Sequence, residues 1–168
     1  MQKIVRLLVL LLMLAGSTAA SAQTSGVKIV TGHPDFKIKI TRCEASGTTC
    51  ILDLLLQNIG ANDTNVKVFG GDYNATVLYD DEGNAYSGRQ VRVSVGNKTP
   101  SSWMNACTLP SEVPVRARLQ IEGVPESATL FTRIDLRLEC PQWGFEWGQN
   151  PPKKAKIINV PIFREGDF

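Results

Sequence analysis

Apolar and polar residues alternate with a period of two along most of the chain, and the spacing of an amphipathic helix hardly occurs. Since successive side chains of a strand point to opposite faces, this alternation predicts strands with one buried face. The segment Gln90–Val95 shows it most clearly, because Val91, Val93 and Val95 alternate with polar residues. Related patterns predict strands at Phe36–Thr41, Ile51–Leu56, Val66–Phe69, Thr76–Tyr79, Val113–Ile121, Arg133–Glu139 and Ala155–Phe163.

Clusters of Gly, Pro and Asn separate these segments, for example Glu82-Gly83-Asn84 and Asn150-Pro151-Pro152. Short strands broken by such turn signals are typical of a β-sandwich or a small barrel. A chain of 168 residues, 43% hydrophobic and 20% charged, fits one ordinary globular domain. We therefore expect one all-β domain over residues 36–168, preceded by a flexible lead at 23–35.

Residues 1–22 have the pattern of a secretory signal peptide. Lys3 and Arg6 precede the apolar run Leu7–Ala15, and Ala20-Ser21-Ala22 supplies small residues for cleavage. The alternative to a cleaved signal is an uncleaved membrane anchor. A bilayer-spanning helix needs about 20 apolar residues, and this run is shorter than that. We predict cleavage after Ala22, no membrane span in the product, and a periplasmic or secreted location.

Cleavage would change the charge of the chain. Residues 1–22 hold two of the 18 basic side chains and none of the 16 acidic ones, so the product would carry 16 of each. Nucleic-acid binding relies on an excess of Lys and Arg that neutralises phosphates. We therefore expect no nucleic-acid partner.

All four cysteines follow the predicted signal, and exported proteins commonly form disulfides. Cys43 and Cys50 flank a short Ser-Gly turn, which favours a bridge across the base of a hairpin and leaves Cys107 to pair with Cys140. Four cysteines allow three connectivities, so the other pairings stay open. Their spacing is not that of a zinc site, and we expect no metal and no cofactor.

Three further stretches have the pattern of strands and turns found in a known fold. They are Leu56–Gly60, the hairpin tip Tyr79–Asn84 and the run Leu109–Val115. With them, the chain over roughly Phe36–Phe163 resembles the small secreted bacterial immunoglobulin-like β-sandwich domains of unknown function. The resemblance implies an antiparallel, immunoglobulin-like sandwich of seven or eight strands in an exported protein. It brings no catalytic residue that could be carried over.

Catalytic signals are scarce. The only histidine, His33, lies in a predicted loop before the first confident strand, and no nucleophile or nucleotide-binding motif occurs. A carbohydrate-active enzyme could work with two carboxylates alone, but no particular pair stands out. The acidic cluster Asp80-Asp81-Glu82 is interpreted as a hairpin turn rather than a cation site. We expect no catalytic residue and no enzymatic activity.

The segment from Cys140 to Gly148 is the most unusual in composition. Trp143, Phe145 and Trp147 alternate in it, so an extended chain would present all three rings on one face. Such rings could contact a protein or a glycan, because Trp is enriched at binding hot spots. They could equally close one end of the sandwich as part of its core. Trp103 could join either arrangement.

Several arginines occupy polar positions of the predicted strands, where they could hold an acidic partner or pair with neighbouring carboxylates. The second use is favoured, because acidic residues occupy the same kind of position. The arginines are Arg92, Arg116, Arg118, Arg133 and Arg137, and the acidic residues are Glu122, Asp135 and Glu139.

These observations favour a non-catalytic binding or structural module of the bacterial cell envelope. It would recognise an envelope protein or a glycan through end loops and the Trp143–Trp147 segment. An alternative is a periplasmic inhibitor or chaperone-like partner of an envelope enzyme. A minor alternative is an accessory to a carbohydrate-active enzyme.

Overall fold

A computed structural model describes residues 26–167, so the predicted signal and its cleavage point lie outside the described part of the chain. The regular structure within it is almost entirely β, with two short 3-10 turns, η1 (Asp72–Asn74) and η2 (Pro141–Trp143). The strands are β1 (Lys28–Val30), β2 (Phe36–Ser46), β3 (Thr49–Asn58), β4 (Thr64–Phe69), β5 (Val77–Asp80), β6 (Ala85–Tyr86), β7 (Val91–Val95), β8 (Met104–Leu109), β9 (Val115–Glu122), β10 (Leu130–Glu139), β11 (Lys154–Pro161) and β12 (Phe163–Arg164).

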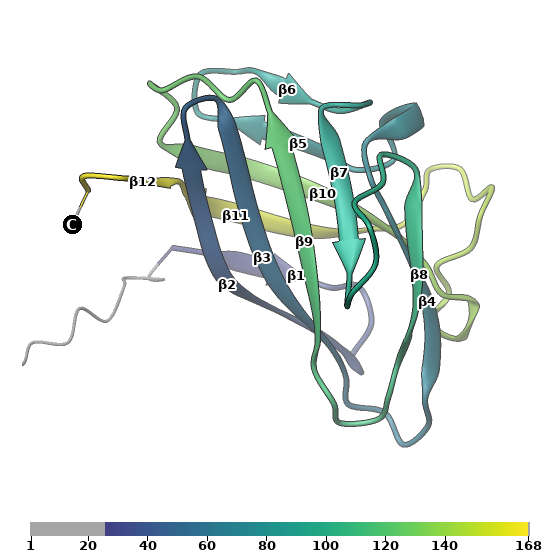
Figure 1. Cartoon of the computed structure of the whole chain (residues 1–168). Helices are drawn as coiled ribbons and strands as arrows, with labels where there is room; N and C mark the ends of the chain where they lie inside the picture. The colour runs from purple at the N-terminus through teal and green to yellow at the C-terminus, as the bar shows by residue number, and fades with distance from the viewer. Residues whose placement is uncertain (1–25, 168) are drawn as a thin grey trace, which may run out of the picture.

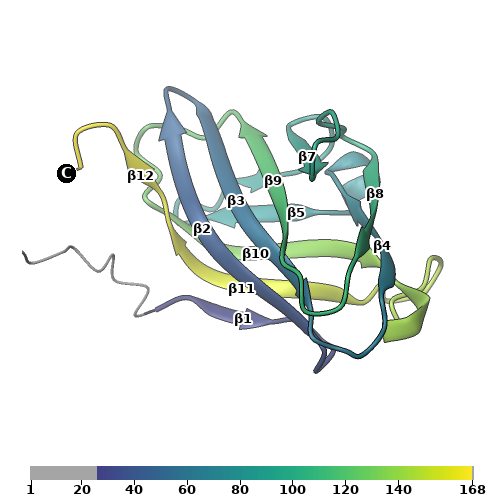
Figure 2. The same ribbon diagram turned by 60° about the horizontal axis from the view of Figure 1, so that its bottom comes forward.

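The strands form two sheets that pack face to face as an immunoglobulin-like β-sandwich. One sheet has the order β1-β11-β10-β4-β8, with β5 paired to β10 and β6 paired to β5. The other has the order β12-β2-β3-β9-β7. The pairings are antiparallel except that of β12 with β2, which is parallel. Figure 1 shows both layers, and Figure 2 shows β2 and β3 crossing over β10 and β11.

The core lies between the sheets and consists of the inward side of each alternating strand. Phe36 and Ile38 point inward from the first part of β2, whereas Cys43 and Ala45 point inward from its second part. The change from even to odd numbers requires one extra residue, and the register with β3 shifts between Ile40 and Arg42. This β-bulge keeps apolar side chains of both halves inside.

All eight predicted strand segments contain a strand, which confirms the all-β prediction. The pattern missed four strands of two to six residues: β1, β6, β8 and β12. The flexible lead expected at 23–35 is wrong for Lys28–Val30, because these residues form β1 and pair with β11. The strands β1, β6 and β12 have only two or three residues, too few to show a period of two. The six residues of β8 do not alternate regularly, because Ala106 and Cys107 are adjacent apolar residues.

The predicted disulfides are absent, and all four cysteines are free thiols. Cys43 and Cys50 are buried side by side with their Sγ atoms 3.8 Å apart, which is contact without a bond. Cys107 lies on β8 and Cys140 directly follows β10, and β4 runs between these two strands. Two strand spacings amount to about 10 Å, beyond the reach of about 7 Å between Cα atoms that a disulfide allows. The predicted Cys107–Cys140 bridge is therefore wrong.

We predict that the denatured chain takes up four alkyl groups without prior reduction, as counted by intact mass. In the folded protein Cys107 should react first, because it is half-exposed and the other three are buried. Burial raises the pKa of the Cys107 thiol, so its rate should keep rising with pH above neutrality. Uptake of fewer groups by the unreduced, denatured chain would contradict the free thiols.

The hairpin between β5 and β6 is organised by Asp80, which is buried at the end of β5. Its Oδ1 accepts hydrogen bonds from the N–H groups of Glu82 and Asn84 at 3.0 and 2.8 Å. Its Oδ2 accepts one from the Asn84 amide at 2.8 Å and one from the Tyr86 hydroxyl at 2.6 Å. These hydrogen bonds hold the turn between β5 and β6, which confirms the turn interpretation of Asp80. Residues 26–167 hold no cluster of His, Cys, Asp or Glu suited to a metal.

We predict that Asp80→Asn lowers the free energy of unfolding by about 1–3 kcal/mol near neutral pH. Burial alone raises the pKa of Asp80, but the four donated hydrogen bonds outweigh it and hold the pKa below its usual range. The stabilisation is therefore present above pH ~4 and is lost as the pH falls through the folded-state pKa. Urea denaturation across pH tests this, with exposed Glu82→Gln as the control; a pH-independent difference would contradict it.

Candidate functional site: an aromatic surface at one end of the sandwich

The segment that carries Trp143, Phe145 and Trp147 is not extended, so its three rings do not share a face. Residues 141–143 form η2, and Gly144 ends this turn with φ of 69°. Glycine adopts this left-handed conformation without steric cost, so the chain reverses there. Cys140 and Phe145 then pair as an isolated bridge. The prediction of one face failed because it assumed a strand where the chain turns.

Trp143 and Phe145 belong to the core. The Trp143 ring stacks on Phe36 and on His33, with centroids 4.9 and 5.6 Å apart. Phe145 is fully buried, with the Lys153 amine 4.7 Å from its ring centroid. For these two rings the core interpretation is confirmed. His33 lies in a loop, as predicted, and is half-buried against the Trp143 ring.

Trp147 lies apart from them in a surface cluster that we call the aromatic patch, formed by Tyr73, Trp103 and Trp147 over the buried ring of Phe69. Their exposed fractions are 87% for Tyr73, 39% for Trp103 and 57% for Trp147. Trp147 stacks on Phe69 with the ring centroids 5.4 Å apart, and it meets Trp103 edge to face with the centroids 5.8 Å apart. The centroid of the Trp103 ring also lies 5.6 Å from that of Tyr73 and 5.7 Å from that of Phe69.

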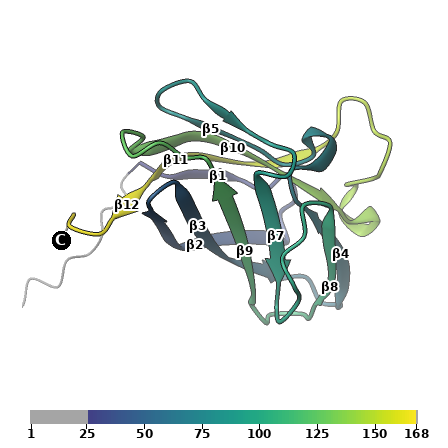
Figure 3. The ribbon, with the colours of Figure 1, turned by 45° about the horizontal axis from the view of Figure 1, so that its top comes forward.

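Close backbone contacts bring the patch together from three distant segments. Phe69 ends β4, and the following Gly70 donates its N–H to the carbonyl of Trp103 at 2.9 Å. A Cβ at Gly70 would collide with the Ser101 carbonyl at 2.7 Å, so only glycine permits this approach. The Asp72 N–H donates to the Ser102 carbonyl at 3.0 Å. Figure 3 shows η1, β8 and the loop before β11 at the same end of the sandwich.

Tyr73 sits on a turn with an unusual backbone. Its φ of 55° and that of Asn74 at 54° lie in the left-handed region, which costs free energy in residues other than glycine. Tethers on both sides hold the turn. The Ser102 hydroxyl donates to the Asp72 carboxylate at 2.9 Å, and Lys154 donates to the Asn74 carbonyl at 3.2 Å. The turn therefore presents the most exposed large hydrophobic side chain among the residues described.

Arg137 forms the base of the loop that carries Trp147. This β10 side chain is only 3% exposed, and it donates to the carbonyls of Glu146 at 2.7 Å and Lys153 at 2.9 Å. Its guanidinium carbon lies 6.0 Å from the centroid of the Trp147 ring. Burial lowers the pKa of Arg137, since the ordered carbonyls replace water only in part. A buried cation thus fixes the loop from below.

Some of the other predicted arginines form ion pairs with carboxylates, and the rest do not. Arg118 binds Asp53 at 2.7 Å, with Arg42 on the same carboxylate at 2.9 Å, and Arg133 binds Asp135 at 2.8 Å. Burial alone raises the pKa of Asp53, but these two guanidiniums hold it below its usual range. Cross-strand pairing is confirmed for Arg118, whose partner Asp53 lies opposite it on β3, whereas Arg133 pairs with Asp135 on its own strand β10. Arg92 and Arg116 make no ion pair within the described chain.

Sequence reasoning named Trp147 and weighed Trp103, but it missed Tyr73 and Arg137 as parts of one site. Only the Gly70-Gly71-Asp72 turn signal pointed toward the η1 region, since glycines in a row indicate close backbone approach. The patch offers apolar ring area and aromatic hydrogen-bond donors next to a buried cation. Residues of this kind are enriched at protein-binding hot spots. Within residues 26–167 there is also no helix with the length and apolarity to cross a bilayer.

No protein-family model matches the sequence, and no curated protein matches it. Several solved structures are similar in shape, including the two that follow. The ASH/PapD-like domain of human CEP192 (PapD-like domain 7) has 12% identity and a TM-score of 0.39, over 81% of this chain and 89% of that one. A family 123 glycoside hydrolase from Clostridium perfringens, studied for glycolipid glycan hydrolysis, has 9% identity and a TM-score of 0.40. The match covers 82% of this chain and only 27% of the hydrolase.

We predict that Arg137→Lys loosens Trp147, because a lysine amine cannot hold both carbonyls in the way that the planar guanidinium does. Acrylamide quenching of Trp147 should increase, measured with Trp103→Phe and Trp143→Phe as background so that one tryptophan reports. Arg133→Lys on the outer side of the same strand is the matched control and should leave quenching unchanged. Equal quenching in the two variants would contradict the positioning role of Arg137.

Proposed function

We propose that this chain is an exported, non-catalytic binding module of the bacterial cell envelope that recognises a partner protein through the aromatic patch. The observation that carries the proposal is the exposure of Tyr73, Trp103 and Trp147 as one contiguous cluster. Contiguous exposed apolar area on a small domain commonly marks an interaction site. Trp, Tyr and Arg are also the residues most enriched at protein-binding hot spots.

The relative orientation of the rings favours a protein over an extended glycan. Trp103 meets Trp147 at an interplanar angle of 70°, and Tyr73 meets Trp103 at 82°. Sugar rings along a glycan stack best on aromatic faces that lie in one plane, whereas these rings present edges and faces at a corner. Such a corner fits between the side chains of a protein surface. An inhibitor or chaperone-like partner of an envelope enzyme would use the same contact.

Export rests on the residues of the predicted signal, namely Lys3, Arg6, the run Leu7–Ala15 and the small residues before Gln23. The hypothesis that the module is non-catalytic rests on the contacts of its titratable groups. His33 packs on Trp143, and the buried carboxylates Asp53 and Asp80 are engaged by arginines and turn donors. Each of these groups is used in holding the fold.

Site-specific crosslinking tests the partner contact. With a photoreactive phenylalanine at Tyr73, we expect one discrete adduct with an envelope protein in the native host, and we expect Trp147→Ala to remove it. The same photoreactive residue at Tyr79, which is 37% exposed on β5 away from the patch, is the matched control and should give none.

Four outcomes would contradict the proposal. Equal adducts from positions 73 and 79 would show that the contact is unspecific, and adducts that persist in Trp147→Ala would place it elsewhere. Binding to a glycan array that falls on Trp147→Ala, without a protein adduct, would favour the glycan version. Turnover of a carbohydrate by the purified protein, abolished by one carboxylate substitution, would contradict the non-catalytic part.

A further inference from the structure

The strand β8 leaves one backbone edge without a strand partner. It pairs with β4 on one side and ends the seven-stranded sheet on the other. Just before β8 begins, the carbonyl of Trp103 accepts a hydrogen bond from Gly70. Because bonding residues alternate along an antiparallel pair, the odd-numbered residues bond to β4. Ala106 and Thr108 therefore turn their N–H and C=O groups to the open side.

A lysine from the opposite side confirms this direction. The Lys98 amine, in the connection between β7 and β8, donates to the carbonyl of Ala106. The strand itself carries no charge from Met104 to Leu109, so no side chain of its own guards the edge. Lysine is a common guard of open strand edges in natural sheets. Here one flexible side chain occupies the acceptor that an added strand would use.

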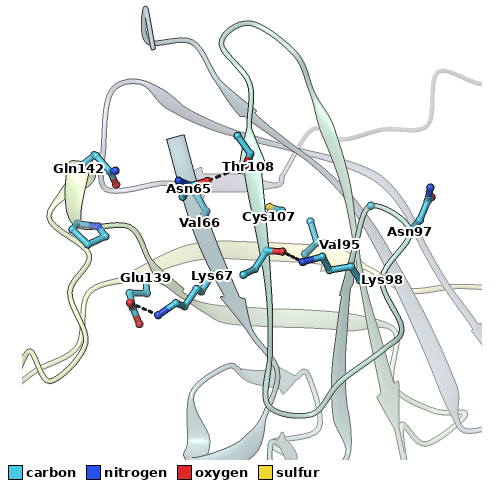
Figure 4. A pocket seen from close by; sticks show the side chains of 13 residues that line it. Asn65, Val66, Lys67, Val95, Asn97, Lys98, Cys107, Thr108, Glu139 and Gln142 are labelled. Carbon is cyan, nitrogen blue, oxygen red and sulfur yellow. Dashed lines mark hydrogen bonds and ion pairs between the residues drawn. The ribbon is translucent and has the colours of Figure 1, made fainter. Parts of the chain in front are cut away.

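A groove of about 720 Å³ runs beside this edge. Figure 4 shows β8 with Cys107 and Thr108 on one side of it and Val95, Asn97 and Lys98 on the other. Val66, Val95 and Cys107 supply its apolar lining. The Lys67–Glu139 ion pair, with its charged atoms 2.7 Å apart, lies at the far side of β4. The groove thus combines main-chain hydrogen-bonding groups with an apolar floor.

We propose that this groove binds an extended, uncharged segment of a partner protein, which adds to β8 as a further strand. The N–H of Thr108 and the carbonyls of Ala106 and Thr108 would pair with its main chain, and a main-chain N–H would replace the Lys98 amine. Alternate small apolar side chains of the segment would face Val95 and Cys107. Recognition of this kind depends on extended shape more than on sequence.

The turn Val95–Lys98, which lies beside β8, favours a single segment over a second copy of this chain. Neighbouring strands lie about 4.8 Å apart, so a segment on β8 would occupy the space in front of the turn Val95–Lys98. A second copy would bring its own identical turn to the same place. The site is also separate from the aromatic patch, so this proposal goes beyond the proposed function and does not depend on it.

The experiment uses a phage-displayed library of random linear peptides panned on the purified folded protein, followed by fluorescence anisotropy of the selected peptides. We expect Thr108→Pro to weaken binding about tenfold or more and the matched Thr108→Ala to change it less than about twofold. Proline deletes the N–H that faces the groove, and that N–H makes no bond to β4. If Thr108→Pro misfolds, the test uses two sets of peptides, with N-methyl groups on the odd-numbered or on the even-numbered residues. Only one of these two methylation phases should abolish binding, because only one removes the N–H groups that face β8.

Several results would overturn the proposal: no enriched peptide, equal binding by Thr108→Pro and Thr108→Ala when both are folded, or equal loss in both methylation phases. Loss of peptide binding in Trp147→Ala would move the peptide to the aromatic patch, which would overturn this proposal and leave the proposed function standing. A dimer of the free protein that Thr108→Pro dissociates would assign the edge to a second copy.

Discussion

The long strands of this protein, such as β2, β3 and β9, must each bury one face against the opposite sheet, and this constraint organises the rest of the structure. A shift of one residue would turn each apolar side chain of a strand toward water, and each such side chain loses about 1.5–3 kcal/mol when exposed. The bulge between Ile40 and Arg42 shows the constraint at work, because one extra residue lets both halves of β2 satisfy it. It also turns Arg42 outward, where it binds the buried carboxylate of Asp53.

The ends of the sandwich are free of this alternation, and the aromatic patch lies at one of them. Its rings come from a turn, the approach to β8 and a long loop, so no strand period places them. Hydrogen bonds place them instead: Gly70 to Trp103, Ser102 to Asp72, and Arg137 to two carbonyls. Arg137 belongs to β10, and this connects the position of Trp147 directly to the packed sheet.

An open sandwich also has edges, and the edges on its two sides differ. The short strands β1 and β12 cover one side, pairing with β11 and β2. On the other side β8 stays open, with Lys98 on the carbonyl of Ala106. Main-chain groups on an edge retain their capacity to bond, and this makes β8 the point where another chain can join the sheet.

The sequence by itself determined the fold class, because alternation over eight segments requires strands with one buried face. It also determined that the acidic hairpin at Asp80 is a turn, since that chemistry is local in the chain. Tertiary structure decided the rest. Cys107 and Cys140 are kept apart by the strand between them, and Trp147 joins Tyr73 while its neighbours Trp143 and Phe145 enter the core. Which strands neighbour one another, and which loops meet at an end, depends on contacts between residues far apart in the chain, and a local pattern carries no record of them.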